Sequence, residues 1–92
     1  MHLDTARSYT LLDALHLQED GEQLLVLDTR SYTVHQLNAS AALVARLCDG
    51  NSTCAEMVAT LAGDHGLQTR EAAEIVFRGL SLLDEQGLLA AA

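Results

Sequence analysis

Few side chains in this chain of 92 residues have the types and the spacing that catalysis or metal binding requires. An enzyme needs a nucleophile, a base and an orienting group held together, or a metal ion with suitable ligands. The four histidines show no His-x-x-x-His spacing, and no serine lies in a Gly-x-Ser-x-Gly turn. The sequence therefore predicts a protein that is not an enzyme and that holds no metal and no cofactor.

The two cysteines, Cys48 and Cys54, form no Cys-x-x-Cys pair and have no adjacent histidine. Cys48 shares one apolar helical face with Leu43, Val44 and Leu47. We therefore expect a reduced and buried thiol at Cys48, rather than a disulfide or a metal ligand.

Composition and charge restrict the classes of partner. Five arginines, no lysine and thirteen acidic residues give a formal net charge of −8, which opposes binding to a polyanion. Apolar residues make up 49% of the chain, but no run approaches the roughly 20 apolar residues of a membrane span. The first residues lack a basic segment followed by an apolar core, so no secretory signal is expected. The sequence predicts a cytoplasmic protein with no nucleic-acid and no membrane partner.

The sequence predicts three strands in its first half. Leu12–Gln18 and Gln23–Asp28 read as two strands joined by a turn at Asp20-Gly21, and Tyr32–Leu37 reads as a third. The continuous apolar run within Gln23–Asp28 is typical of a central strand with neighbours on both edges. Residues 1–9 show no clear period and are expected to form a flexible arm, while residues 10–92 form a single domain.

Three helices should follow. Asn38 is a strong cap for a helix at 39–48, which Gly50 should end. Thr53 and Glu56 have the spacing of a capping box for a second helix, which should end near Gly63–Gly66. Thr69 should cap a third helix, whose apolar positions are too many for one narrow face: Ala72, Ile75, Val76, Gly79, Leu80, Leu82, Leu83 and Leu88. Either this helix packs centrally, or a second apolar strip lines a groove beside the sheet.

This order of elements resembles the PqqD-like family, also called RiPP recognition elements, which bind the leader of ribosomally made precursor peptides. The resemblance covers residues 10–89 and depends on Leu24–Asp28, Leu37-Asn38, Leu47, Asp49-Gly50, Glu56-Met57, Leu61 and the stretch from Leu80 to Leu89. It is greatest to the stand-alone leader-binding proteins of lasso-peptide biosynthesis. It implies an α+β fold like a winged helix-turn-helix, with a three-stranded antiparallel sheet followed by three helices.

The resemblance also implies a binding site. A leader would add as a further strand beside the third strand, at Tyr32, Thr33, Val34, His35 and Gln36. Val76, Leu80 and Leu83 of the third helix would form the other wall of the groove. Arg78 and Arg30 would pair with acidic residues of the leader.

The function implied is a non-catalytic adaptor that binds a precursor peptide and delivers it to a processing enzyme, first of all a lasso-peptide leader peptidase. A PqqD-type chaperone for a radical enzyme remains an alternative within the family. A winged-helix DNA-binding regulator is an alternative from another class, although residues 53–64 contain no basic side chain for phosphate contacts. A third alternative is a structural interaction module without a peptide ligand.

Overall fold

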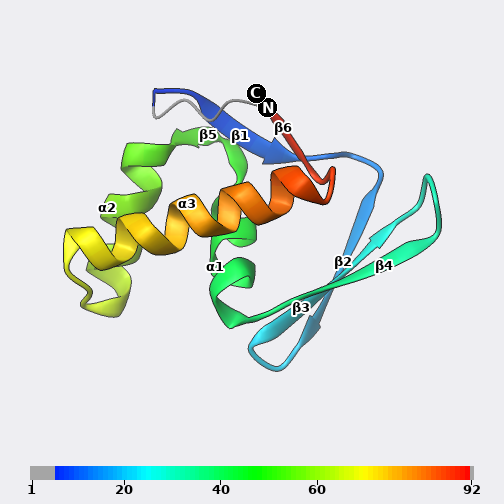
Figure 1. Cartoon of the computed structure of the whole chain (residues 1–92), viewed down its shortest axis with the longest axis horizontal. Helices are drawn as coiled ribbons and strands as arrows, with labels where there is room; N and C mark the ends of the chain where they lie inside the picture. The colour runs from blue at the N-terminus through cyan, green and yellow to red at the C-terminus, as the bar shows by residue number, and fades with distance from the viewer. Residues whose placement is uncertain (1–5, 92) are drawn as a thin grey trace.

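The computed structural model describes residues 6–91, which form two three-stranded antiparallel sheets and three helices (Figure 1). The elements follow in the order β1 (Ser8–Leu11), β2 (Leu15–Asp20), β3 (Gln23–Asp28), β4 (Thr33–Leu37), α1 (Ala39–Leu47), β5 (Asp49–Thr53), α2 (Cys54–His65), α3 (Thr69–Glu85) and β6 (Leu89–Ala91). The expected α+β class is confirmed. The expected single sheet is wrong, because a second sheet of short strands is present.

The first sheet has the order β2-β3-β4 and contains the three strands read from the sequence. Gly21 takes a φ of 65° in the turn between β2 and β3, a conformation that glycine adopts without strain. Strand β3 has the expected bounds, whereas β2 begins at Leu15 instead of Leu12. Strand β4 begins at Thr33, because Tyr32 has a left-handed φ of 57° that takes it out of the extended strand.

The second sheet has the order β5-β1-β6, and no pattern in the sequence predicts it. Its middle strand lies partly within residues 1–9, where a flexible arm was expected. That expectation is wrong for Ser8, which pairs in β1, and for Tyr9, which is completely buried. Residues 1–5 lie outside the part that the structure describes. Hydrophobic periodicity does not reveal these strands, because they have five residues or fewer and pair with distant segments.

Local capping chemistry sets where the helices begin. The side chain of Asn38 accepts a hydrogen bond from the Ala41 N–H at 2.9 Å, and both bonds of the Thr53–Glu56 capping box are present. Two details differ from expectation. Gly50 lies inside β5 instead of ending α1, whose last residue is Leu47. Helix α3 begins at Thr69 itself, after Gln68 at the N-cap position, which makes no side-chain cap.

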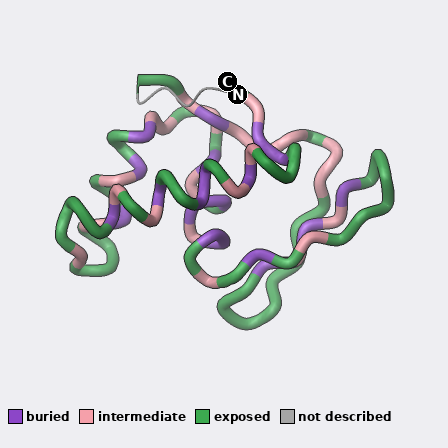
Figure 2. The backbone as a smooth tube through the Cα atoms, in the orientation of Figure 1, coloured by how far each residue is buried: buried purple, intermediate pink, exposed green. Residues whose placement is uncertain are grey.

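Helix α3 packs at the centre of the molecule, against α1 and α2, with the second sheet along one side (Figure 1). Its buried face consists of Ala72, Val76, Gly79, Leu80 and Leu83, and Figure 2 shows how buried and exposed positions alternate along it. Gly79 permits the close approach to α1, since a Cβ at this position would lie 2.5 Å from Cγ2 of Val44. Within residues 6–91, no helix has the length and apolar character to cross a membrane.

Candidate functional site

Strand β4 forms one edge of the β2-β3-β4 sheet. Within the described residues it pairs with β3 alone, so its second edge offers N–H and C=O groups to a further strand. Most of the strand is exposed, and Val34 has 62% of its surface accessible. Strand β4 thus has the geometry for binding an extended chain.

The pairing register assigns the side chains of β4 to two faces. Thr33, His35 and Leu37 lie opposite Asp28, Val26 and Leu24, which are all buried. Their side chains therefore share the face that is turned to the core. Val34 and Gln36 belong to the outer face, opposite Leu27 and Leu25.

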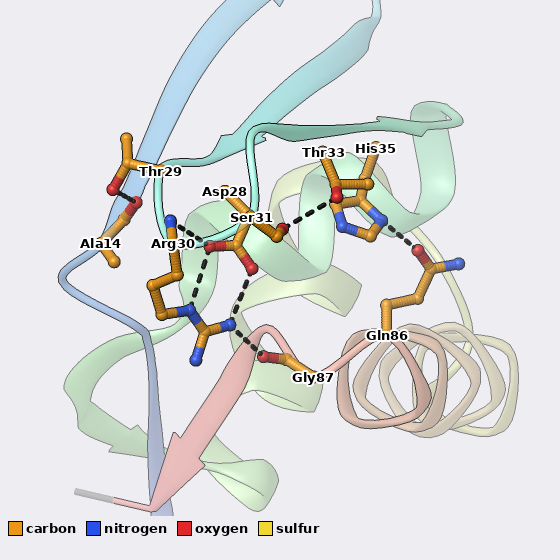
Figure 3. Close-up of polar contacts among 9 residues, drawn as sticks. All are labelled: Ala14, Asp28, Thr29, Arg30, Ser31, Thr33, His35, Gln86 and Gly87. Atoms are coloured by element: carbon orange, nitrogen blue, oxygen red, sulfur yellow. Dashed lines mark hydrogen bonds and ion pairs between the residues drawn. The ribbon is translucent and has the colours of Figure 1, made fainter.

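A hydrogen bond from Nδ1 of His35 to Oε1 of Gln86 brings the C-terminal turn of α3 next to β4 (Figure 3). Arg78 and Leu82 lie on the same helical row as Gln86, because residues four apart stack along one side of a helix. Arg78 is exposed and Leu82 is half-buried. We call Arg78, Leu82 and Gln86 the exposed row of α3.

The three apolar residues that were predicted to form the helix wall lie in the core. Val76, Leu80 and Leu83 are completely buried in the core, so they present no surface to a groove beside β4. Arg78, in contrast, does lie on the exposed row. Leu82 and Gln86 were not among the predicted site residues. The excess of apolar residues on α3 indicated that some of them lie outside the core. The sequence pattern does not show that Leu82 is one of these residues, because this depends on how α3 packs.

Arg30, which was predicted to bind an acidic residue of a peptide, is paired with an acidic residue of its own chain. Its Nε and Nη2 donate to the two carboxylate oxygens of Asp28 at 3.0 and 2.7 Å, and Nη2 also donates to the Gly87 carbonyl at 3.3 Å (Figure 3). The Arg30 hydrogen bonds lower the pKa of Asp28 to about 2. Arg30 therefore fastens the β3–β4 loop to the end of α3, while its side chain keeps 54% of its surface exposed.

Two more hydrogen bonds stabilise the same loop. The Thr29 hydroxyl donates to the Ala14 carbonyl at 2.6 Å, and Ser31 and Thr33 share a bond of 2.8 Å between their hydroxyls (Figure 3). Within this loop Tyr32 is 82% exposed and keeps its left-handed backbone. The loop therefore holds an aromatic ring in solvent at the start of β4, where it can contact a bound chain.

Along the outside of α3 the surface is hollowed between Phe77, Arg78, Ser81, Leu82 and Glu85. Two members of the exposed row, Arg78 and Leu82, border this hollow. It is shallow and open, which suits a side chain of a bound peptide better than an enclosed small molecule.

The described residues include no group of three or more His, Cys, Asp or Glu side chains that could hold a metal ion. Both cysteines are buried, and burial raises the pKa of the Cys48 thiol to about 12. The expected reduced and buried state of Cys48 is confirmed, and at neutral pH the group is a thiol of low reactivity.

Comparison with known proteins supplies the family. Residues 23–89 match the family model described as coenzyme PQQ synthesis protein D (PqqD). A structure of lasso peptide synthetase B1 complexed with the leader peptide superposes with a TM-score of 0.72 and 26% identity, over 90% of this chain and 98% of that chain. A structure of TbiB1 in complex with the TbiA(beta) leader peptide shares the fold, with a TM-score of 0.73 and 16% identity over 87% and 93% of the two chains. No curated protein matches. Because the family model spans most of its length, this chain belongs to the PqqD family.

Proposed function

We propose that this protein is a non-catalytic adaptor that binds the leader of a ribosomally synthesised precursor peptide and delivers it to a processing enzyme. The observation that carries the proposal is the outer edge of β4, which is unpaired within residues 6–91 and lies next to the C-terminal turn of α3. The structure of a lasso peptide synthetase B1 with its leader peptide, at 26% identity, supports a peptide as the ligand.

In this proposal the leader adds to the sheet as a fourth strand. Backbone groups of Thr33, Val34, His35 and Gln36 pair with the leader, which gives affinity with little dependence on sequence. The exposed ring of Tyr32 packs against one end of the bound strand. Arg78 contributes from the helix side, while Val76, Leu80 and Leu83 keep α3 in place from within the core.

The benefit to a processing enzyme is a higher local concentration of its substrate. A leader held on an adaptor that also contacts the enzyme presents the rest of the precursor at an effective concentration of about millimolar. We propose a leader peptidase of a lasso-peptide pathway as the enzyme, because of the likeness to lasso peptide synthetase B1. The PqqD family match supports a radical enzyme as the second candidate. The adaptor would act in the cytoplasm, where ribosomal peptides are released.

The test is titration calorimetry of the chain with the synthetic leader of a precursor encoded beside its gene. We expect a dissociation constant between about micromolar and nanomolar, and mass spectrometry should show an unaltered peptide. A scrambled leader of the same composition is the control. Folded protein at about 100 micromolar that gives no heat with the leader would refute the proposal.

A further inference from the structure

The β2-β3-β4 sheet keeps apolar side chains accessible on the face that is turned away from the core. Leu25 and Leu27 are half-buried there, whereas Leu24 and Val26, which alternate with them along β3, are each only 1% exposed. By the pairing register this face has two rows across the three strands: His16, Leu27 and Val34, then Gln18, Leu25 and Gln36. We call these six residues the outer sheet face.

The outer sheet face is hollowed as well as apolar. The hollow measures about 370 Å³, and all three strands contribute to its lining: His16, Leu17, Gln18, Leu25, Leu27 and Val34. The hollow along α3, in contrast, is lined by residues of a single helix. Exposed apolar groups with a polar rim are typical of surfaces that bind another protein. The outer sheet face therefore has the shape and composition to receive a protruding apolar side chain.

The charges beside the outer sheet face are acidic. Asp20 lies two positions after Gln18 on β2 and so belongs to the same face, and Glu22 lies in the turn that follows. Within the described residues neither carboxylate forms an ion pair, whereas Glu19, on the opposite face, pairs with Arg46. The outer sheet face itself contains no arginine or lysine. This combination attracts a basic partner surface and repels an acidic one.

Charge and continuity favour one occupant over the others. A second copy of this chain would bring a further charge of −8, and like charges across an interface lower affinity. A leader that pairs with the edge of β4 leaves β2 and β3 uncovered. An adaptor needs a second surface for its enzyme, and the outer sheet face reaches the β4 edge through Val34.

We propose that the outer sheet face is the docking surface for the processing enzyme, whose contact patch presents a protruding apolar side chain beside a lysine or arginine. The apolar side chain packs over Leu25 and Leu27, and the basic side chain pairs with Asp20. The docked enzyme lies next to a leader strand on β4, because Val34 borders both surfaces. This inference rests on the proposed function, which requires an enzyme as partner.

The experiment measures binding of the purified leader peptidase encoded beside the gene of this chain to the full chain loaded with leader, by biolayer interferometry. Replacing both leucines, Leu25→Thr with Leu27→Thr, should weaken binding by at least about tenfold, and threonine suits a strand. Asp20→Lys should weaken it by about threefold to tenfold and reduce its dependence on salt. Phe77→Gln and Glu74→Lys make matched changes at exposed positions of α3 and should bind as wild type does.

Titration of each variant with the leader separates the two surfaces. The outer-face variants should bind the leader as wild type does, because they change β2 and β3 and leave the edge of β4 intact. Circular dichroism confirms that each variant folds. Asp20→Lys, at an exposed position, decides the question if the double variant does not fold.

Three results would overturn the inference while leader binding stands. They are unchanged peptidase binding in the outer-face variants, no peptidase binding to leader-loaded wild type, and a dimer in sedimentation that the double variant loses. Folded outer-face variants that lose the leader would also overturn it, because the face would then belong to the leader site. Wild type that binds neither leader nor peptidase would refute the proposed function, and the inference would fail with it.

Discussion

Asp28 and Arg30 form an ion pair that joins the β3–β4 loop to the end of α3. Asp28 ends β3, and its side chain is 8% exposed beneath the Arg30 guanidinium. Because Arg30 also bonds the Gly87 carbonyl, the pair ties the start of β4 to the end of α3. These two residues therefore hold the β3–β4 loop against the residue that follows α3.

The ionisation of Asp28 should make stability depend on pH in the acid range. Its pKa falls from 3.8 to about 2 in the folded protein, so the carboxylate stabilises the fold fully above about pH 4. This contribution is lost as the pH falls through about 2. Urea unfolding at a series of pH values should therefore show a stability difference between wild type and Asp28→Asn that shrinks from pH 4 to pH 2.

Arg30→Met is the matched variant for this measurement, because it removes the partner and keeps the carboxyl group. Its acid-range loss of stability should be smaller than that of wild type, since Arg30 is the main cause of the shifted pKa. Parallel stability curves for all three proteins between pH 4 and pH 2 would contradict the assigned role.

At the scale of elements, the approach of α3 to α1 depends on a single glycine. Gly79→Ala should destabilise the protein by about 1–3 kcal/mol, because its Cβ would lie within 3 Å of three atoms of Val44. Gly63→Ala in α2 is the matched control. Its Cβ would meet nothing within 4 Å, so the better helix propensity of alanine should stabilise by about 1 kcal/mol. Chemical denaturation measures both, and equal effects would contradict the packing argument.

Strand β4 is the element on which peptide binding is proposed to depend. Proline removes a backbone N–H, and adjacent residues of a strand direct their N–H groups to opposite edges. Of Val34→Pro and His35→Pro, one should therefore remove a bond to the peptide and the other a bond to β3. The variant that affects the free edge should bind the leader about tenfold more weakly and keep its helical circular dichroism.

The second proline variant serves as the internal control, because it should lower stability through the β3–β4 pairing. If both variants fold and bind the leader as wild type does, β4 is not the docking edge. In that case Tyr32, Thr33, Val34, His35 and Gln36 would also lose their proposed role.

At the scale of the whole molecule, charge separates a peptide adaptor from a DNA-binding regulator. The net charge is −8, and α2 contains Glu56 and Asp64 but no arginine or lysine. We expect no measurable binding to duplex DNA near physiological salt, because few counterions would be released. Gel shift on random and promoter DNA checks this. Sub-micromolar binding that weakens steeply with added salt would favour the regulator.

The sequence by itself determined the features that depend on neighbouring residues. The Asn38 cap, the Thr53–Glu56 capping box and the Gly21 turn are each formed within a few residues, so their chemistry can be read directly. The bounds of β3 followed from the same local patterns. The order of these elements was sufficient to identify the family, and the family resemblance implied the candidate strand.

Only the tertiary structure decided which surfaces those elements present. The β5-β1-β6 sheet joins strands that lie 35 or more residues apart, so no local pattern predicts it. The choice between Leu80 in the core and Leu82 on the exposed row depends on how α3 packs against α1. Whether Arg30 faces a ligand depends on the Gly87 carbonyl, 57 residues away. In each case the deciding contact comes from a distant part of the chain, where periodicity and capping carry no information.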